Sequence, residues 1–180
     1  MTNQTDRPKS SFSKPIPPFI ARGEKYDRVR VGSTGVRGLG VFALVDIKGG
    51  RAVGRVKGEL KPKDYRSCYC IDFGDGTLEP FEPYRFLNHS CDPNCQLIEW
   101  QIELDSDKPI LELWVHTLRD IKADEELTID YAWEWRFAVP CLCGSENCRG
   151  WICKAEELDK CVKFHSNLDC SRDNSTDSTE

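Results

Sequence analysis

Three cysteines lie close together near the end of the chain, where the sequence CLCGSENC runs from Cys141 through Cys143 to Cys148. Thiolates with this spacing can surround a single tetrahedral ion, and Zn²⁺ prefers such soft sulfur ligands. Gly144 would let the backbone reverse sharply after Cys143. A fourth ligand is needed to complete the shell. Its candidates by position are Cys91, Cys95, Cys153, Cys161 and the three histidines.

A second polar segment, RFLNHSCDPNC, runs from Arg85 to Cys95. The amide of Asn88 can both donate and accept hydrogen bonds, and His89 adds a ring that titrates near neutral pH. Taken alone, an Asn-His pair is most often part of a capped turn. His89 with Cys91 and Cys95 is also a candidate for a second zinc site.

Two further segments place small or polar residues at the ends of apolar runs. The sequence RGLG at 37–40 opens one run, and its paired glycines would let a ligand approach the backbone closely. It is not a GxGxxG motif and no helix obviously follows, so a dinucleotide site is not favoured and a tight turn is the default. Tyr131 follows Asp130 at the end of another run, where a tyrosine is usually just packed.

Short strands are expected to carry these residues, because the body of the chain alternates polar and apolar positions over brief runs. The ranges predicted to be strands are 28–31, 40–45, 51–56, 68–73, 96–104, 110–117 and 126–131. The turn-forming residues at 105–109 predict a hairpin between the strands on either side. Helical periodicity is weak except at 154–163, so the predicted fold class is mostly β.

The two ends differ in composition from this body. Residues 1–24 are rich in Ser, Pro and Thr and predict a flexible arm. The stretch from Ser166 to Glu180 is polar and mostly acidic and predicts a disordered tail.

Composition narrows the classes of function. The net charge of −5 disfavours a general nucleic-acid binder and fits modestly with a basic partner such as a lysine-rich tail. No apolar run is long enough to span a membrane and the first residues lack a signal-peptide core, so an intracellular location is expected. In a reducing compartment the ten cysteines are expected to hold metal or stay free rather than form a secreted disulfide scaffold.

Four motifs, taken together and in this order, resemble the SET-domain protein lysine methyltransferases that carry a post-SET zinc segment. The motifs are GVRGLGVFA at 35–43, RFLNHSCDPNC at 85–95, DEELTIDYA at 124–132 and CLCGSENCRGW at 141–151. The resemblance implies a SET-domain fold of several small sheets with a pseudoknot, plus a small zinc-bound post-SET segment. The expected division is a flexible arm at 1–24, a SET domain at 25–137, a post-SET zinc segment at 138–154, and a short helix with an acidic disordered tail at 155–180.

The resemblance also assigns roles to individual residues. Tyr131 would be the catalytic residue, and Asn88 would bind S-adenosyl-L-methionine directly. His89 and Leu142 would contact its adenine. The complete set of candidate cofactor contacts is Arg37, Gly38, Leu39, Tyr69, Asn88, His89 and Leu142. A structural Zn²⁺ with a closed shell would be held by Cys91, Cys141, Cys143 and Cys148.

Two features depart from the family pattern. The sequence RVKG at 55–58 stands where many members have a Glu-Tyr pair, so an accessory active-site tyrosine is absent unless Tyr65 or Tyr69 compensates. Ile129 stands two residues before Tyr131, where many members have Phe or Tyr. An aliphatic residue has no hydroxyl to hold a blocking water, so di- or trimethylation is sterically allowed.

The predicted activity is therefore methylation of lysine side chains in a protein or peptide, such as a histone tail. The expected location is the nucleus or chromatin of a eukaryote, or the cytoplasm of a bacterium, with no direct nucleic-acid binding and no membrane. The competing interpretation is a SET-like, zinc-stabilised binding module that has lost catalysis, for which the missing Glu-Tyr pair is the best argument. A zinc ribbon unrelated to methylation would leave the NHSC and DY segments unexplained.

Overall fold

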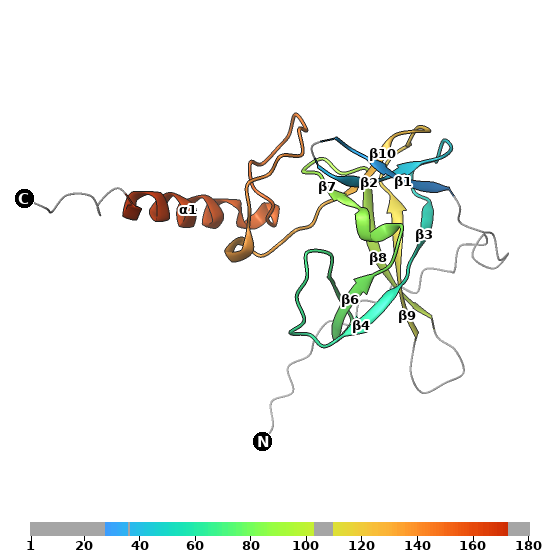
Figure 1. The fold of residues 1–180 in the computed structure, drawn as a ribbon, viewed down its shortest axis with the longest axis horizontal. Helices are drawn as coiled ribbons and strands as arrows, with labels where there is room; N and C mark the ends of the chain where they lie inside the picture. The colour runs from blue at the N-terminus through green and yellow to red at the C-terminus, as the bar shows by residue number, and fades with distance from the viewer. Residues whose placement is uncertain (1–27, 36, 103–109, 173–180) are drawn as a thin grey trace, which may run out of the picture.

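The computed structural model describes residues 28–35, 37–102 and 110–172, and the side chains of these as far as residue 166. The described chain forms three small β-sheets and ends in a helix (Figure 1). This architecture confirms the predicted mostly β class. The arm predicted at 1–24 and the turn predicted at 105–109 lie outside the described residues.

The first sheet joins two segments that are far apart in the sequence. Its strands, in spatial order, are β1 (Val29–Ser33), β2 (Leu39–Ala43), β10 (Glu126–Ile129) and β7 (Asn88–His89). β1, β2 and β10 pair antiparallel, whereas β7 pairs parallel with β10, with Thr128 opposite Asn88 and Ile129 opposite His89. Residues 88–89 and 128–129, far apart in the sequence, therefore lie side by side.

The second sheet contains the two strands predicted to form a hairpin. Its strands, in spatial order, are β3 (Ala52–Val56), β9 (Ile110–Thr117) and β8 (Cys95–Ile102). β8 and β9 pair antiparallel along their whole length, from Cys95 opposite Thr117 to Ile102 opposite Ile110. Leu113 on β9 is buried in the core, and its neighbour two positions on, Val115, is buried on the same face.

The third sheet was largely missed by the sequence-based prediction. Its strands, in spatial order, are β4 (Gly58–Lys61), β6 (Gly76–Pro80) and β5 (Ile71–Phe73). The strand predicted at 68–73 is correct only at 71–73. The preceding residues form a local turn, because the backbone N–H of Tyr69 donates to Ser67 Oγ at 3.1 Å. This turn places Tyr69 outside the sheet.

The main hydrophobic core is shared by the three sheets and anchors the strand that leads to Tyr131. Val41 on β2, Val53 on β3 and Leu127 on β10 are fully buried in it, and Ile129 is 6% exposed. Burying a leucine or isoleucine side chain contributes about 1.5–3 kcal/mol. The alternate residues Leu127 and Ile129 therefore fix the register of β10, and with it the direction in which the chain leaves the strand.

Beyond β10 the chain forms the cysteine-rich segment and then a helix that projects away from the sheets (Figure 1). Short 3₁₀ turns flank the cysteine-rich segment: η3 (Trp135–Phe137) before it and η4 (Ala155–Glu157) after it. The helix α1 (Leu158–Arg172) begins inside the helical range predicted from the sequence but continues to Arg172, so residues 166–172 are helical rather than tail. Within the described residues, none of the helices has the length and apolar character needed to cross a membrane.

Candidate active site and metal centre

The parallel contact between β7 and β10 assembles the polar residues predicted from separate motifs. Asn88 and His89 make up β7, and the N–H of the next residue, Ser90, donates to the carbonyl of Ile129 at 2.9 Å. Tyr131 follows two residues after Ile129, and its own N–H donates to Nδ1 of His89 at 3.2 Å. The NHSC and DY motifs therefore form one continuous site.

The imidazole of His89 carries its hydrogen on Nε2, since Nδ1 accepts the hydrogen bond from Tyr131. Burial lowers the pKa of His89, although the nearby carboxylate of Asp130 acts in the opposite direction. The ring is therefore neutral near pH 7, and because Nδ1 accepts from Tyr131, the hydrogen sits on Nε2. Nε2 lies 3.3 Å from Sγ of Cys91, so His89 donates toward that sulfur.

Tyr131 presents its hydroxyl to a backbone carbonyl at the wall of a cavity. Its Oη donates to the carbonyl oxygen of Leu87 at 2.7 Å. Burial raises the pKa of Tyr131 to about 12, so the phenol stays protonated at physiological pH. The indole of Trp133 stacks on the Tyr131 ring, with centroids 5.4 Å apart and planes 29° apart. Tyr131 is thus held at both the ring and the hydroxyl.

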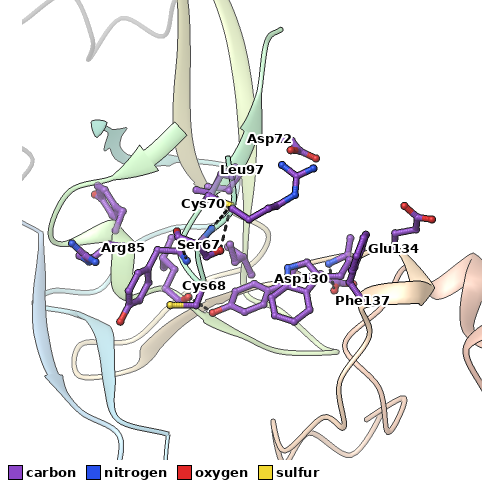
Figure 2. A pocket seen from close by; sticks show the side chains of 18 of the residues that line it. Ser67, Cys68, Cys70, Asp72, Arg85, Leu97, Asp130, Glu134 and Phe137 are labelled. Atoms are coloured by element: carbon purple, nitrogen blue, oxygen red, sulfur yellow. Dashed lines mark hydrogen bonds between the residues drawn. The ribbon is translucent and has the colours of Figure 1, made fainter. Parts of the chain in front are cut away.

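The cavity beside Tyr131 has a volume of about 690 Å³ and mixes aromatic and charged walls. Figure 2 shows Ser67, Cys68 and Arg85 toward one side and Asp130 and Phe137 toward the other. Tyr69 also lines it, with the Arg85 guanidinium 4.3 Å from the Tyr69 ring centroid. Tyr65 instead lies beneath Lys61, whose Nζ is 5.6 Å from its ring centroid. Of the two tyrosines considered as an accessory group, Tyr69 is the one on the cavity.

The candidate cofactor side of β7 is organised by Asn88. Its Nδ2 donates to the carbonyl oxygen of Leu39 at 2.9 Å and to Oε1 of Glu126 at 2.8 Å. The RGLG turn is therefore in contact with the NHSC motif. Arg37, predicted to contact the cofactor through its backbone, uses its side chain to pair with Oε2 of Glu126 at 2.6 Å.

The four predicted zinc ligands meet in space. The sulfur atoms of Cys91, Cys141, Cys143 and Cys148 all lie within 4.8 Å of one another. The Cys91 and Cys141 sulfurs are 3.7 Å apart, and a tetrahedral ion with Zn–S bonds of about 2.3 Å separates its sulfurs by about 3.8 Å. Gly144 adopts φ +75°, which provides the sharp reversal expected after Cys143.

The electrostatics of this cluster favour a cation at its centre. Burial raises the pKa of both Cys91 and Cys141. Burial also opposes ionisation of Cys143, yet the N–H of Cys91 and the hydroxyl of Ser145 lower the pKa of Cys143 to about 6. Four sulfurs so close together cannot all carry negative charge without a counterion, and a dication bound to thiolates removes that conflict. The residues present therefore fit Zn²⁺.

The other candidate ligands lie elsewhere in the structure. Cys95 is fully buried in the main core. Cys153 and Cys161 are fully buried in a second hydrophobic cluster with Ala138, beside Trp135, Trp151 and Leu158. In the folded chain these three cysteines are buried free thiols. The second zinc site considered for His89, Cys91 and Cys95 is not assembled, because Cys91 belongs to the four-sulfur cluster and Cys95 to the core.

Leu142, between two of the clustered cysteines, has an unusual environment for its type. It is 82% exposed, the highest value among the large hydrophobic residues described as exposed. An isolated exposed leucine is ordinary, but this one sits on the segment that the cysteine cluster holds in place. It is therefore free to cover a ligand.

Sequence-based reasoning missed three contributors to the site. Glu126, Trp133 and the ion pair of Asp130 with Arg149 appear only once the chain is folded. The acidic run before β10 gave no indication of which carboxylate faces inward. For Trp133 the one available signal was its position, two residues after Tyr131.

A family model and several curated proteins match parts of this chain. A family model described as the SET domain matches residues 38–132, more than half of the chain. Histone-lysine N-methyltransferase ASHR3 of Arabidopsis thaliana is 42% identical over 79 residues, which is 43% of this chain and 15% of that protein. An H3 lysine-4 specific histone-lysine N-methyltransferase of Emericella nidulans is 46% identical over 72 residues, 38% of this chain and 6% of that protein.

A solved structure shows the same fold. KRYPTONITE, determined in complex with mCHG DNA and SAH, aligns with a TM-score of 0.58 and 23% identity over 69% of this chain and 28% of that chain. The family model covers β2 through Tyr131, the segment that the structure organises around the β7–β10 contact. The chain belongs to the SET domain family.

Proposed function

We propose that this chain transfers methyl groups from S-adenosylmethionine to lysine side chains of proteins. The observation that carries the proposal is the parallel pairing of β7 with β10, which sets Asn88 and His89 beside the end of the strand that leads to Tyr131. Family membership supports it, as do the relatives named as histone-lysine N-methyltransferases. The matched segments are small parts of those relatives, so the activity is inferred from the site itself.

The cofactor would lie against the RGLG turn and β7. Asn88 would bind its methionine part together with the backbone of Gly38 and Leu39, and His89 would contribute its backbone to the adenine. When bound, S-adenosylmethionine supplies an electrophilic methyl group on a sulfonium. Leu142 would cover the adenine, which would give its exposed side chain an apolar partner.

The cavity would receive the target lysine. A lysine amine has a pKa of about 10.4 in water and must lose its proton before it can attack a methyl group. Loss of water from the amine beside the rings of Tyr131 and Trp133 would disfavour its charged form. Tyr131 cannot serve as the base, because its pKa of about 12 keeps the phenol protonated. The hydroxyl oxygen of Tyr131 would instead orient the amine, while its O–H continues to donate to the carbonyl oxygen of Leu87.

Tyr69 would form the facing wall of the same cavity rather than a cofactor contact. Its ring lies under the Arg85 guanidinium and meets the Phe86 ring edge-on, with centroids 6.3 Å apart. These contacts fix the ring and give the cavity a second aromatic surface near Tyr131. We propose that Tyr69 takes over part of the role of the missing Glu-Tyr pair.

The zinc ion would be structural. Cys91, Cys141, Cys143 and Cys148 would fill all four positions of a tetrahedral shell, which leaves none open for a reacting ligand. Because Cys91 follows β7 while the other ligands come from the C-terminal segment, the ion would fasten that segment against the cofactor side of the site.

The substrate would be a lysine in a basic protein segment. The relatives are named for histone lysines, and the net charge of −5 on this chain is complementary to a histone tail. A histone substrate would place the protein in the nucleus or on chromatin.

The proposal is tested first by calorimetric titration of the zinc-loaded protein with S-adenosylmethionine. Binding that weakens after zinc is removed with a chelator would support both the cofactor site and the cysteine cluster. Incubation with methyl-labelled cofactor and histone tail peptides should then transfer label to lysine. Absence of cofactor binding by zinc-loaded protein would favour the binding module without catalysis. If the wild type binds the cofactor but transfers no label, the peptides tested are not substrates. Protein extracts would then be incubated with the labelled cofactor to find the substrate.

A further inference from the structure

The side-chain nitrogen of Asn88 faces two oxygen atoms at once. Nδ2 lies 2.9 Å from the carbonyl oxygen of Leu39 and 2.8 Å from Oε1 of Glu126. A backbone carbonyl and a carboxylate only accept hydrogen bonds, so the end of the amide that faces them must be the NH₂ group. Both amide hydrogens are then used, and Oδ1 is left to accept a hydrogen bond.

Glu126 is itself held in place from its other oxygen. Oε2 receives a hydrogen bond from Nη2 of Arg37 at 2.6 Å, and the side chains of Arg37 and Glu126 are only 30% and 14% exposed. The guanidinium carries a permanent charge. Backbone pairing of Glu126 with Phe42 fixes the start of β10 beside β2. The carboxylate therefore cannot turn away from Asn88 without breaking the ion pair.

Gly40 makes room for this contact. A Cβ at position 40 would lie 2.7 Å from Oε1 of Glu126 and 3.1 Å from Nδ2 of Asn88. A side chain there would also meet Cγ2 of Thr34 at 2.5 Å, so it would crowd both partners of the hydrogen bond. The glycine of the RGLG turn thus serves the hydrogen bond between Glu126 and Asn88, besides any approach of a ligand to the backbone.

We infer that Glu126 is a positioning residue that fixes which end of the Asn88 amide is presented to the cofactor. The inference rests on the proposed function, in which Asn88 meets the methionine part of S-adenosylmethionine. Nδ2 donates to Leu39 and Glu126, so only Oδ1 is left to contact the cofactor, and it can bind only a hydrogen-bond donor. On the methionine part of the cofactor that donor is the α-ammonium. An amide that could flip would also offer its NH₂ group to the α-carboxylate, which would weaken this selection.

The test is a double-mutant cycle read by calorimetry on zinc-loaded protein. Glu126→Gln preserves the shape of the side chain, but the NH₂ group of the glutamine can face Asn88. One of the two acceptors that hold the Asn88 amide in a single orientation is then lost. We expect S-adenosylmethionine to bind about tenfold more weakly, the scale of one charge-assisted hydrogen bond. In the Asn88→Ala background the same substitution should change affinity by less than about twofold, since no amide remains to be oriented.

A second ligand separates positioning from damage to the fold. 5′-Methylthioadenosine shares the adenosine and the S-methyl group with the cofactor but lacks the amino-acid end, so Glu126→Gln should leave its affinity unchanged. Glu125→Gln is the matched control, because Glu125 binds Asn94 and Arg119 instead of Asn88. Should Glu126→Gln fail to fold, Arg37→Lys loosens the same carboxylate while keeping the charge and should produce a smaller loss of the same kind.

The outcomes separate this inference from the proposed function. Equal losses in the wild-type and Asn88→Ala backgrounds, or equal losses for both ligands, would show that Glu126 only supports the fold and would overturn the inference. Unchanged cofactor affinity in both Glu126→Gln and Arg37→Lys would do the same. Failure of the wild type to bind S-adenosylmethionine would instead overturn the proposed function and remove the basis of the inference.

Discussion

Arg149 donates two hydrogen bonds to Asp130, from Nη1 and Nη2 of its guanidinium, each 2.8 Å from a different carboxylate oxygen. Arg149 directly follows the cluster residue Cys148, and its backbone N–H donates to Sγ of Cys91 at 3.4 Å. Asp130 directly precedes Tyr131. The pair therefore connects the cysteine cluster to the end of β10, and through it to the cavity.

Replacing Arg149 by Lys should loosen this connection. A lysine keeps the charge but cannot make two parallel hydrogen bonds, and the side chains of Arg149 and Asp130 are only 14% and 28% exposed. We expect a loss of about 1–3 kcal/mol in the free energy of unfolding. Urea unfolding of the zinc-loaded protein measures it.

Arg136→Lys is the matched control for that substitution. Arg136 pairs with Glu134, but these side chains are 63% and 40% exposed, so water screens the pair. The same change there should cost less than about 1 kcal/mol. Equal effects at the two positions would contradict the special role given to the Arg149–Asp130 pair.

Substituting Cys148 by Ser should abolish metal binding by the cluster. Three thiolates and a hydroxyl bind Zn²⁺ far less well than four thiolates, so the zinc content should fall from about one ion per chain to a small fraction of that. Mass spectrometry of the metals in purified protein measures it. Cys68→Ser is the control, since Cys68 is exposed and lies on the cavity instead. Full zinc retention by Cys148→Ser would remove Cys148 from the ligand set.

Leu142→Ala should weaken cofactor binding without weakening the fold. Because Leu142 is 82% exposed, its truncation removes little buried surface from the free protein. If its side chain covers the adenine, the dissociation constant for S-adenosylmethionine should rise about tenfold. Calorimetry and thermal unfolding of the same samples separate the two effects. A lower melting temperature with unchanged affinity would place Leu142 in the fold instead of the cofactor site.

Local sequence patterns were sufficient for elements that are stabilised by their immediate neighbours. The hairpin of β8 and β9 was predicted because both strands are long and a turn-forming sequence separates them. β7 was not, since a strand of two residues exists only through its contact with β10. β4 and β6 carry polar residues and a terminal proline, and their pairing with each other is what makes them strands.

The candidate site shows the same limit. The resemblance of four motifs was needed to select Cys91 as the fourth ligand, because nothing in the spacing distinguishes it from Cys95. Once the chain is folded, Cys95 is in the core and Cys91 in the cluster. The direction of a side chain at the end of a strand depends on long-range pairing, which local propensity does not encode. Glu126 was missed for that reason.

Tyr131→Phe should lower the rate while leaving its pH dependence unchanged. Burial raises the pKa of Tyr131 to about 12, so the wild-type phenol does not titrate between about pH 7 and about pH 9.5. The rise in kcat/KM over that range should come from loss of the proton on the substrate lysine, and the variant should show the same slope. We expect the overall rate to fall about a hundredfold or more, because the orienting hydroxyl is gone. A flat profile in Tyr131→Phe would mean that Tyr131 is the group that titrates.

Ile129→Tyr should shift the products toward monomethyl-lysine. Ile129 is 6% exposed, lines the cavity and packs in the core. A tyrosine there would bring a hydroxyl that can hold a water where a second methyl group must fit. Mass spectrometry of a peptide after long incubation measures the ratio of mono-, di- and trimethyl forms. The larger ring will also strain the core, at a cost of about 1–3 kcal/mol, so Ile129→Phe is needed as a control of nearly equal volume without the hydroxyl. The interpretation requires Ile129→Phe to keep the higher methylation states that Ile129→Tyr loses; the same products from both variants would mean that volume, and not the hydroxyl, sets the limit.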